Sequence, residues 1–167
     1  MGLLGGAPPT AGPDSERFFA AGVTYVCCGA WTLACDCFAR CARGDASTLY
    51  NKALCCFQVA WYEECHRLLG DAERLLNDKP DKVSCTGVPT GPPHQHPEAF
   101  RCWEAASDLS RCPLLPETPR DEALTLIFRL RAEAAFRLGR YEEVRTIAAR
   151  LGHRYEHLEN LLKPIDR

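Results

Sequence analysis

The chain has 167 residues, enough for one domain with a substantial hydrophobic core. Hydrophobic residues make up 46% and charged residues 25% of the sequence, which is typical of a globular protein and not of a disordered one. The formal net charge of −2 argues against nucleic acid or an anionic membrane as a partner, and no apolar run reaches the roughly 18 residues of a transmembrane helix. We therefore expect a protein of the cytoplasm or the nucleus.

The sequence contains 11 cysteines, a number that would indicate disulfide bonds in a small secreted protein. No basic region followed by a long apolar segment marks a secretion signal, and most of the cysteines fall inside predicted helices. A free cysteine packs as a small hydrophobic residue. We therefore expect most of these cysteines to be reduced and to contribute to the core.

The N-terminal segment, residues 1–14, is rich in glycine, proline and alanine and shows no periodicity. Such a composition predicts a disordered segment. A first helix should follow it, with Asp14 or Ser15 as the N-cap.

Residues 18–41 contain large and small apolar side chains in the order that two short antiparallel helices need in order to cross closely. The first helix is predicted to end near Gly29 and the second to span residues 30–42. A glycine inside a helix costs roughly 1 kcal/mol relative to alanine, so Gly22 indicates a packing requirement. Gly22 and Ala34 are small enough to let the two helix axes approach to about 8–10 Å.

A second two-helix unit is predicted to begin at Ser47 or Thr48, so that the first two units occupy residues 15–76. Its apolar residues repeat those of the first unit after a shift of 31 residues. The repeated positions are Ala53, Cys56, Ala60, Tyr62, Cys65, Leu69 and Ala72.

The regular pattern is lost in residues 77–118. The first half of this segment is interrupted by Pro80, Pro89, Pro92, Pro93 and Pro97. Prolines exclude a helix there, and a loop this long is either functional or disordered. The second half contains one candidate helix over residues 97–111, with an apolar face made of Phe100, Trp103, Ala106 and Leu109.

A third unit is predicted over residues 119–152, because Thr118 is a suitable N-cap and Pro119 a suitable first helical residue. Its apolar positions are Phe128, Ala132, Ala135, Gly139, Tyr141, Val144 and Ala148. The final segment, residues 153–167, is predicted to form a helix that covers the exposed edge of the third unit, as the end of a stack of repeats requires. The apolar face of this helix consists of Tyr155, Leu158, Leu161 and Leu162.

These units resemble the tetratricopeptide repeat, whose consensus has an aromatic residue, Leu-Gly and Tyr in the first helix and Ala and Phe in the second. The best matches to the turn of this family are residues 138–143, Leu-Gly-Arg-Tyr-Glu-Glu, and residues 59–64, Val-Ala-Trp-Tyr-Glu-Glu. In the first unit Ala21 replaces the usual Leu, Trp31 the usual Tyr and Cys41 the usual Ala. The resemblance implies an all-α fold, a right-handed stack of about three helix-turn-helix pairs with a Pro-rich insertion and a C-terminal capping helix.

In this family the first helix of each pair lines a concave surface that binds partners, so the resemblance implies a binding groove. On that face the first two units place six apolar residues, which are Phe19, Val23, Val26, Tyr50, Leu54 and Phe57. An apolar groove favours a partner helix or an extended apolar segment. The alternative is that the chain's own residues 97–111 cover the groove, with Trp103 as a plug.

Some members of the family bind the C-terminal carboxylate of chaperone tails through Lys and Asn side chains. Asn51 matches one of these positions, but Phe19 and Val23 stand where the leading Lys and Asn would be. A carboxylate buried without donors is costly. Binding of chaperone tails is therefore disfavoured.

Two groups of residues are candidates for metal ligands. The first is a C-x-C-x₃-C arrangement on a predicted helix, made of Cys35, Cys37 and Cys41. The second, in the Pro-rich segment, comprises Cys85, His94, His96 and Cys102. The chain has no C-x-x-C pair, the usual element of a structural zinc site, and the spacing of the second group matches no standard site.

Catalytic signals are weak. Cys65 and His66 are adjacent, but neighbours on a helix point about 100° apart and do not form a catalytic pair. Arg129, Glu133 and Arg137 are spaced by four residues, which predicts ordinary ion pairs on a helix surface. The sequence contains no phosphate-binding loop, HExxH or GxSxG motif.

The sequence therefore favours a non-catalytic adaptor or scaffold without a cofactor, which binds another protein through an apolar groove, by itself or within a larger complex. The alternative, from a different class, is a cysteine- and histidine-dependent zinc-binding or redox protein. Stoichiometric zinc that is lost when Cys85 or His96 is replaced would favour this alternative.

Overall fold

The computed structural model describes residues 12–42, 44–78, 112–153 and 155–166. All regular secondary structure in these ranges is helical, which confirms an all-α architecture for this part of the chain. The helices are α1 (Pro13–Cys27), α2 (Trp31–Arg40), α3 (Ala46–Gln58), α4 (Tyr62–Asp78), α6 (Arg120–Arg137), α7 (Tyr141–Arg150) and α8 (Glu156–Leu162). Most of the N-terminal segment and of the Pro-rich segment, with the predicted helix over residues 97–111, lies outside the described residues.

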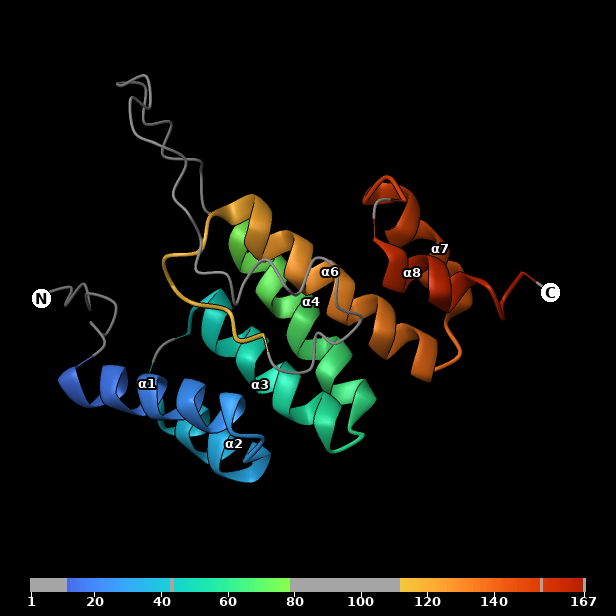
Figure 1. Ribbon diagram of the computed structural model, residues 1–167. Coiled ribbons are helices and arrows are strands. Elements are labelled where there is room, and N and C mark those ends of the chain that lie inside the picture. The colour runs from blue at the N-terminus through green and yellow to red at the C-terminus, as the bar shows by residue number, and fades with distance from the viewer. Residues whose placement is uncertain (1–11, 43, 79–111, 154, 167) are drawn as a thin grey trace, which may run out of the picture.

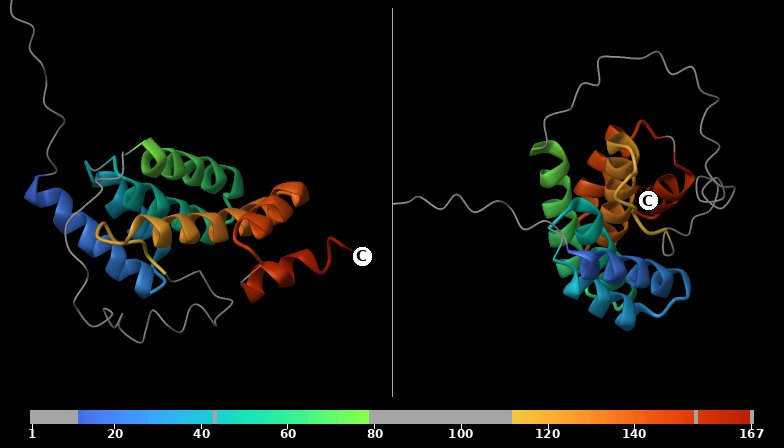
Figure 2. Two further views of the ribbon diagram at one scale, coloured as in Figure 1. Left: turned by 90° about the horizontal axis from the view of Figure 1, so that it is seen from above. Right: turned by 90° about the vertical axis from the view of Figure 1, so that its left-hand side faces the viewer.

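The helices form a row of antiparallel hairpins that follows the order of the chain (Figure 1). α1 packs on α2, α3 on α4, and α6 on α7. Between hairpins, α2 contacts α3 and α4 contacts α6. α8 packs against α6 and α7, so that α1 and α8 lie at opposite ends of the row (Figure 2).

Each hairpin turns at a residue with a left-handed backbone conformation. The φ angles are 73° at Gly29, 62° at Ala60 and 72° at Gly139. In every case the next amide donates a hydrogen bond to the carbonyl five residues earlier, from Ala30 to Tyr25 (2.8 Å), Trp61 to Cys56 (2.9 Å) and Arg140 to Ala135 (2.8 Å). Such a bond closes the C-terminus of a helix, so the three turns share one geometry. The first two turns lie 60 − 29 = 31 residues apart, which is the repeat distance read from the sequence.

Small residues occupy equivalent buried positions seven residues before each turn residue. These are Gly22, Ala53 and Ala132. A Cβ atom added at Gly22 would lie 2.7 Å from Cε1 of Phe38, closer than side chains approach one another. Close packing at Gly22 is therefore confirmed, but the side chain nearest to it is Phe38 and not Ala34.

Two hydrophobic clusters hold the row together. The larger cluster joins α1, α2, α3 and α4 to α6 and includes Leu114 from the segment before α6. The smaller cluster lies among α6, α7 and α8, where α8 buries Leu158 and Leu162. The two clusters meet along α6, so this helix connects the first two hairpins to the C-terminal part of the chain.

Three helix starts differ from the sequence-based expectation. The Ser15 hydroxyl does not cap α1; it accepts a hydrogen bond from the Ala42 amide at 3.1 Å and so ties α1 to the end of α2. The N-cap of α3 is Asp45, whose carboxylate accepts from the Thr48 amide at 2.9 Å. In α6 the N-cap is Pro119, one residue later than predicted.

Arg129 and His157 form a buried polar contact between α6 and α8. Nε and Nη2 of Arg129 lie 3.4 and 3.2 Å from Nδ1 of His157, and the guanidinium carbon lies 4.6 Å from the ring centroid of Tyr155. Burial, and then the positive charge of Arg129, lower the pKa of His157 to about 4. His157 is therefore neutral at physiological pH and accepts from Arg129.

We expect this contact to make the protein sensitive to acid. Because the pKa of His157 is about 4 when folded and 6.5 when exposed, its contribution is complete above pH 6.5 and is lost as the pH falls toward 4. The loss in the free energy of unfolding is up to about 3 kcal/mol. His157→Asn keeps an acceptor that does not titrate, so urea unfolding at pH 7 and pH 5 should show a smaller acid effect. An equal acid effect in both proteins would contradict the role of His157.

Candidate functional site

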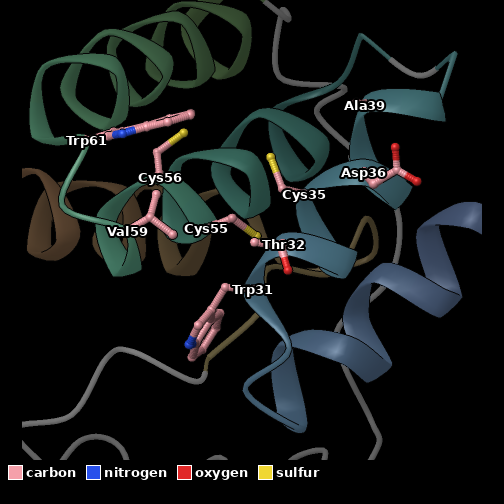
Figure 3. A pocket seen from close by; sticks show the side chains of 9 residues that line it. All are labelled: Trp31, Thr32, Cys35, Asp36, Ala39, Cys55, Cys56, Val59 and Trp61. Carbon is pink, nitrogen blue, oxygen red and sulfur yellow. The ribbon is translucent and has the colours of Figure 1, made fainter.

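An apolar pocket of about 330 Å³ lies between α2 and the end of α3 (Figure 3). Its lining comes from α2, from the C-terminal end of α3 and from the turn that leads into α4. The lining residues are Trp31, Thr32, Cys35, Asp36, Ala39, Cys55, Cys56, Val59 and Trp61.

Helical spacing and the turn geometry create this pocket. Trp31, Cys35 and Ala39 are spaced by four residues, so they share one face of α2. Cys35 and Ala39 are small and leave space between the first and second hairpins. The left-handed conformation of Ala60 reverses the chain and places Trp61 at the rim, where 64% of its surface is exposed.

Exposed large apolar side chains gather around the pocket. Val59 and Trp61 line it, with 40% and 64% of their surfaces exposed, and Trp31 lines it from α2. Figure 3 shows the two tryptophans on different sides of the pocket, with Val59 and the α3 cysteines between them. An exposed apolar patch of this kind marks a site of interaction with another molecule.

Two acidic side chains near the pocket already have basic partners. Asp36 Oδ2 lies 3.1 Å from Nε of Arg40. Glu64, close enough to Cys56 to affect its pKa, lies 2.6 Å from Nη2 of Arg67. These ion pairs leave the apolar lining as the main feature that a ligand would recognise.

Two cysteines of the pocket, Cys55 and Cys56, are poorly reactive thiols. Burial, and then the neighbouring Cys35, raise the pKa of Cys55 to about 12 and that of Cys56 to about 11. The thiolate is the nucleophile and the metal ligand, and it is scarce at neutral pH when the pKa is this high. These residues act as small hydrophobic side chains in the wall of the pocket.

Cys65 and His66 have different surroundings. This agrees with their adjacent positions on the helix, which predict that they do not form a catalytic pair. Cys65 is fully buried, and burial raises the pKa of its thiol. Nε2 of His66 lies 2.9 Å from the carboxylate of Glu143, and Nδ1 accepts from Arg140 at 3.2 Å. His66 thus joins α4 to the α6–α7 hairpin.

The predicted groove is not an open surface. Phe19, Val26, Tyr50 and Leu54 are buried, with at most 6% of the surface of each exposed, and only Val23 and Phe57 are partly exposed. The physical reason is that these residues pack in one core cluster with Phe38 of α2, with Leu114 and Leu115, and with apolar residues of α6. The alternative, in which residues 97–111 cover the groove with Trp103 as a plug, falls on residues outside the described ranges.

Asn51, considered above as a carboxylate-binding residue, instead holds the main chain of Leu114. Its Oδ1 accepts from the Leu114 amide at 2.9 Å, and its Nδ2 donates to the Leu114 carbonyl at 2.8 Å. Asn51 is fully buried and Leu114 is 2% exposed. Sequence reasoning missed this contact, because the two residues are 63 positions apart and no periodicity connects them.

The prediction of ordinary surface ion pairs on α6 is wrong for Arg129, which is 1% exposed and contacts α8. The ion pairs that join helices in this region use Arg131, which contacts Glu73 of α4 and Glu143 of α7, each at 2.7 Å. Burial raises the pKa of Glu143, but the hydrogen bond from His66 and the charge of Arg131 hold it below its usual value. This network stabilises the junction between the second hairpin and the α6–α7 hairpin.

The weak zinc candidates Cys85, His94, His96 and Cys102 lie outside the described residues. In the part of the chain that the structure describes, no group of three or more Cys, His, Asp or Glu side chains could hold a metal ion. Of the C-x-C-x₃-C residues, Cys41 has its Sγ 3.6 and 3.3 Å from the carbonyl oxygens of Ser15 and Cys37, which share its one S–H donor.

No helix among the described residues is long and apolar enough to cross a membrane. Comparison of the chain with protein-family models, with curated proteins and with solved structures gave no match, so the chemistry of the pocket is interpreted from its own residues.

Proposed function

We propose that this chain is a non-catalytic adaptor built from tetratricopeptide-like repeats, which binds an apolar segment of another protein in the pocket between α2 and the α3–α4 turn. Three hairpins with one turn geometry support the repeat assignment. Small buried residues at equivalent positions, Gly22, Ala53 and Ala132, support it further. A stack of repeats presents a shaped surface, and such surfaces suit the binding of proteins.

The exposure of Trp61 is the observation that carries this proposal. An indole that is 64% exposed at the rim of an apolar pocket gains free energy when a partner buries it. Tryptophan is also enriched among the residues that dominate the binding energy of interfaces. Because Asp36 is paired with Arg40, the pocket favours an uncharged anchor, such as a leucine or phenylalanine side chain of a helix or peptide.

Replacing Trp61 with alanine should weaken partner binding at least about tenfold, since loss of a dominant interface tryptophan costs about 2 kcal/mol or more. Affinity capture from cell extract, quantified by mass spectrometry, compares wild type, Trp61→Ala and Leu33→Ala. Leu33 is a matched control because it is 52% exposed on α2 but does not line the pocket. Helical content is checked by circular dichroism.

The expected result is a set of proteins retained by wild type and Leu33→Ala and lost from Trp61→Ala. Unchanged capture by a folded Trp61→Ala protein would contradict the proposal. A charge introduced at the predicted groove tests folding and not partner binding. Leu54→Asp should unfold the protein, because Leu54 is fully buried.

A further inference from the structure

A positively charged residue, Lys52, lies beside the apolar pocket on α3. It precedes Cys56 and Val59 by four and seven residues, so the three residues share one face of the helix. Cys56 and Val59 line the pocket, whereas the partly exposed Lys52 lies one helical turn before Cys56. Burial is the main reason that the pKa of the Cys56 thiol is raised, and the charges of Arg67 and Lys52 act in the opposite direction. The positive charge of Lys52 is therefore felt at the wall of the pocket.

The charged side chains nearest to the pocket neutralise one another, with the exception of Lys52. Asp36 is paired with Arg40, and Glu64 is paired with Arg67. Lys52 makes neither a hydrogen bond nor an ion pair with any other residue that the structure describes. These pairings leave one positive charge beside an otherwise apolar site.

A partner that covers the pocket also acts on Lys52. The aliphatic stem of a lysine follows apolar surface and carries the ammonium group to the rim, where a bound partner excludes water. A cation that loses water without gaining an opposite charge costs free energy. A carboxylate of the partner at this point removes the cost and favours the correct partner, whereas a second cation there is repelled.

We propose that the partner segment carries an aspartate or glutamate close to its apolar anchor, and that Lys52 pairs with this carboxylate while the anchor fills the pocket. This inference rests on the proposed function, because it specifies the chemistry of the partner at the same pocket. Residues three or four apart on a partner helix have Cβ atoms about 5–6 Å apart, which matches the spacing of Lys52 and Cys56 on α3. Lys52 thus selects acidic apolar segments against basic ones.

Peptide selection by phage display tests this charge preference without a known partner. The full chain is immobilised as wild type, Lys52→Glu, Lys163→Glu and Trp61→Ala, and a library of random peptides is selected on each protein. Lys163 is a matched control because it is exposed at the end of α8, which packs on α6 and α7 and not on the helices of the pocket. Its replacement by glutamate changes the net charge by the same amount.

Wild type and Lys163→Glu should enrich peptides with an acidic residue near a leucine or phenylalanine. Lys52→Glu should enrich lysine or arginine in the same place, and Trp61→Ala should enrich neither set. Peptides that require Trp61 but carry the same charges on wild type and on Lys52→Glu would overturn this inference and leave the proposed function standing. Peptides that do not require Trp61, or the absence of any enriched peptide, would contradict the proposed function as well.

Fluorescence anisotropy with one labelled acidic peptide from the wild-type selection then measures the pair itself. Lys52→Met keeps the aliphatic stem and should weaken binding about two- to fivefold, the loss expected for an ion pair near a surface, and Lys52→Glu should weaken it further. Methionine and glutamate both favour helices, so α3 should stay folded. High salt should weaken binding to wild type more than binding to Lys52→Met.

A charge exchange assigns the effect to the two named groups. Replacing the acidic residue of the peptide with lysine should weaken binding to wild type and restore binding to Lys52→Glu, because the same pair then forms with its charges reversed. Equal affinities of wild type and Lys52→Glu for the acidic peptide would overturn the role of Lys52.

Discussion

Gly22→Ala is expected to destabilise the protein by about 1–3 kcal/mol, whereas Gly70→Ala should stabilise it by up to about 1 kcal/mol. Both glycines lie inside helices, where alanine is intrinsically favoured. A Cβ atom added at Gly22 would meet the Phe38 ring at 2.7 Å, while no atom of the described residues lies within 4 Å of a Cβ atom at Gly70. Phe38 is fully buried and packs with Phe19 in an edge-to-face arrangement, with ring centroids 5.6 Å apart, so a shift of its ring would disturb this packing.

Chemical unfolding in urea measures both variants at one pH. The opposite signs are what distinguishes a packing requirement from helix propensity, since propensity alone would stabilise both proteins. Stabilisation by Gly22→Ala equal to that by Gly70→Ala would show that α1 and α2 do not cross as closely as the structure indicates.

Asn51→Ala should have a comparable or larger effect, a loss of about 2–4 kcal/mol in the free energy of unfolding. The variant leaves the amide and the carbonyl of Leu114 buried without their partner, and each such group costs about 1–3 kcal/mol. Domains of this kind unfold with only about 5–15 kcal/mol, so the loss is a large share of the total.

Asn77→Ala is the matched control for this change. Asn77 is exposed at the end of α4 and accepts one long hydrogen bond from Arg120, at 3.3 Å. Its replacement should change stability by no more than about 0.5 kcal/mol. Equal small effects of Asn51→Ala and Asn77→Ala would show that residues 112–116 contribute nothing to the stability of the native state.

The hairpins could be predicted from the sequence because their signals are local. Gly29, Ala60 and Gly139 each end a helix, and a buried small residue lies seven positions before each of them. These signals depend on helix spacing and turn chemistry, which a short stretch of sequence contains in full. The same is true of α8, whose Leu158 and Leu162 are buried as their spacing predicts.

The groove could not be judged from the sequence, because exposure depends on what lies opposite. Tyr50 and Leu54 occupy the positions of a concave surface in the family that the sequence resembles, but here they are buried in one cluster with Leu114 and residues of α6. Arg129 illustrates the same limit: its spacing from Glu133 suggests a surface ion pair, yet α8 folds over it and buries it.

The apolar pocket was missed for a related reason. Trp61 precedes Tyr62 in a turn, and an aromatic residue in this position is easily taken for one more part of the core. A signal was present, however. The residue that follows the left-handed residue of the turn is Ala30 in the first hairpin and Arg140 in the α6–α7 hairpin, neither of which is a large apolar side chain.

Site-specific photocrosslinking in cells tests most directly whether the apolar pocket is where this protein meets its partner. Thr32 lines the pocket and is exposed, and Thr24 is an exposed threonine on α1 that does not line it. Replacing Thr32 with a photoreactive phenylalanine derivative should give a defined crosslinked protein, which disappears when Trp61→Ala is added. The same derivative at Thr24 should give none. Crosslinks of equal yield at both positions, or a product at Thr32 that persists with Trp61→Ala, would contradict the proposed binding site.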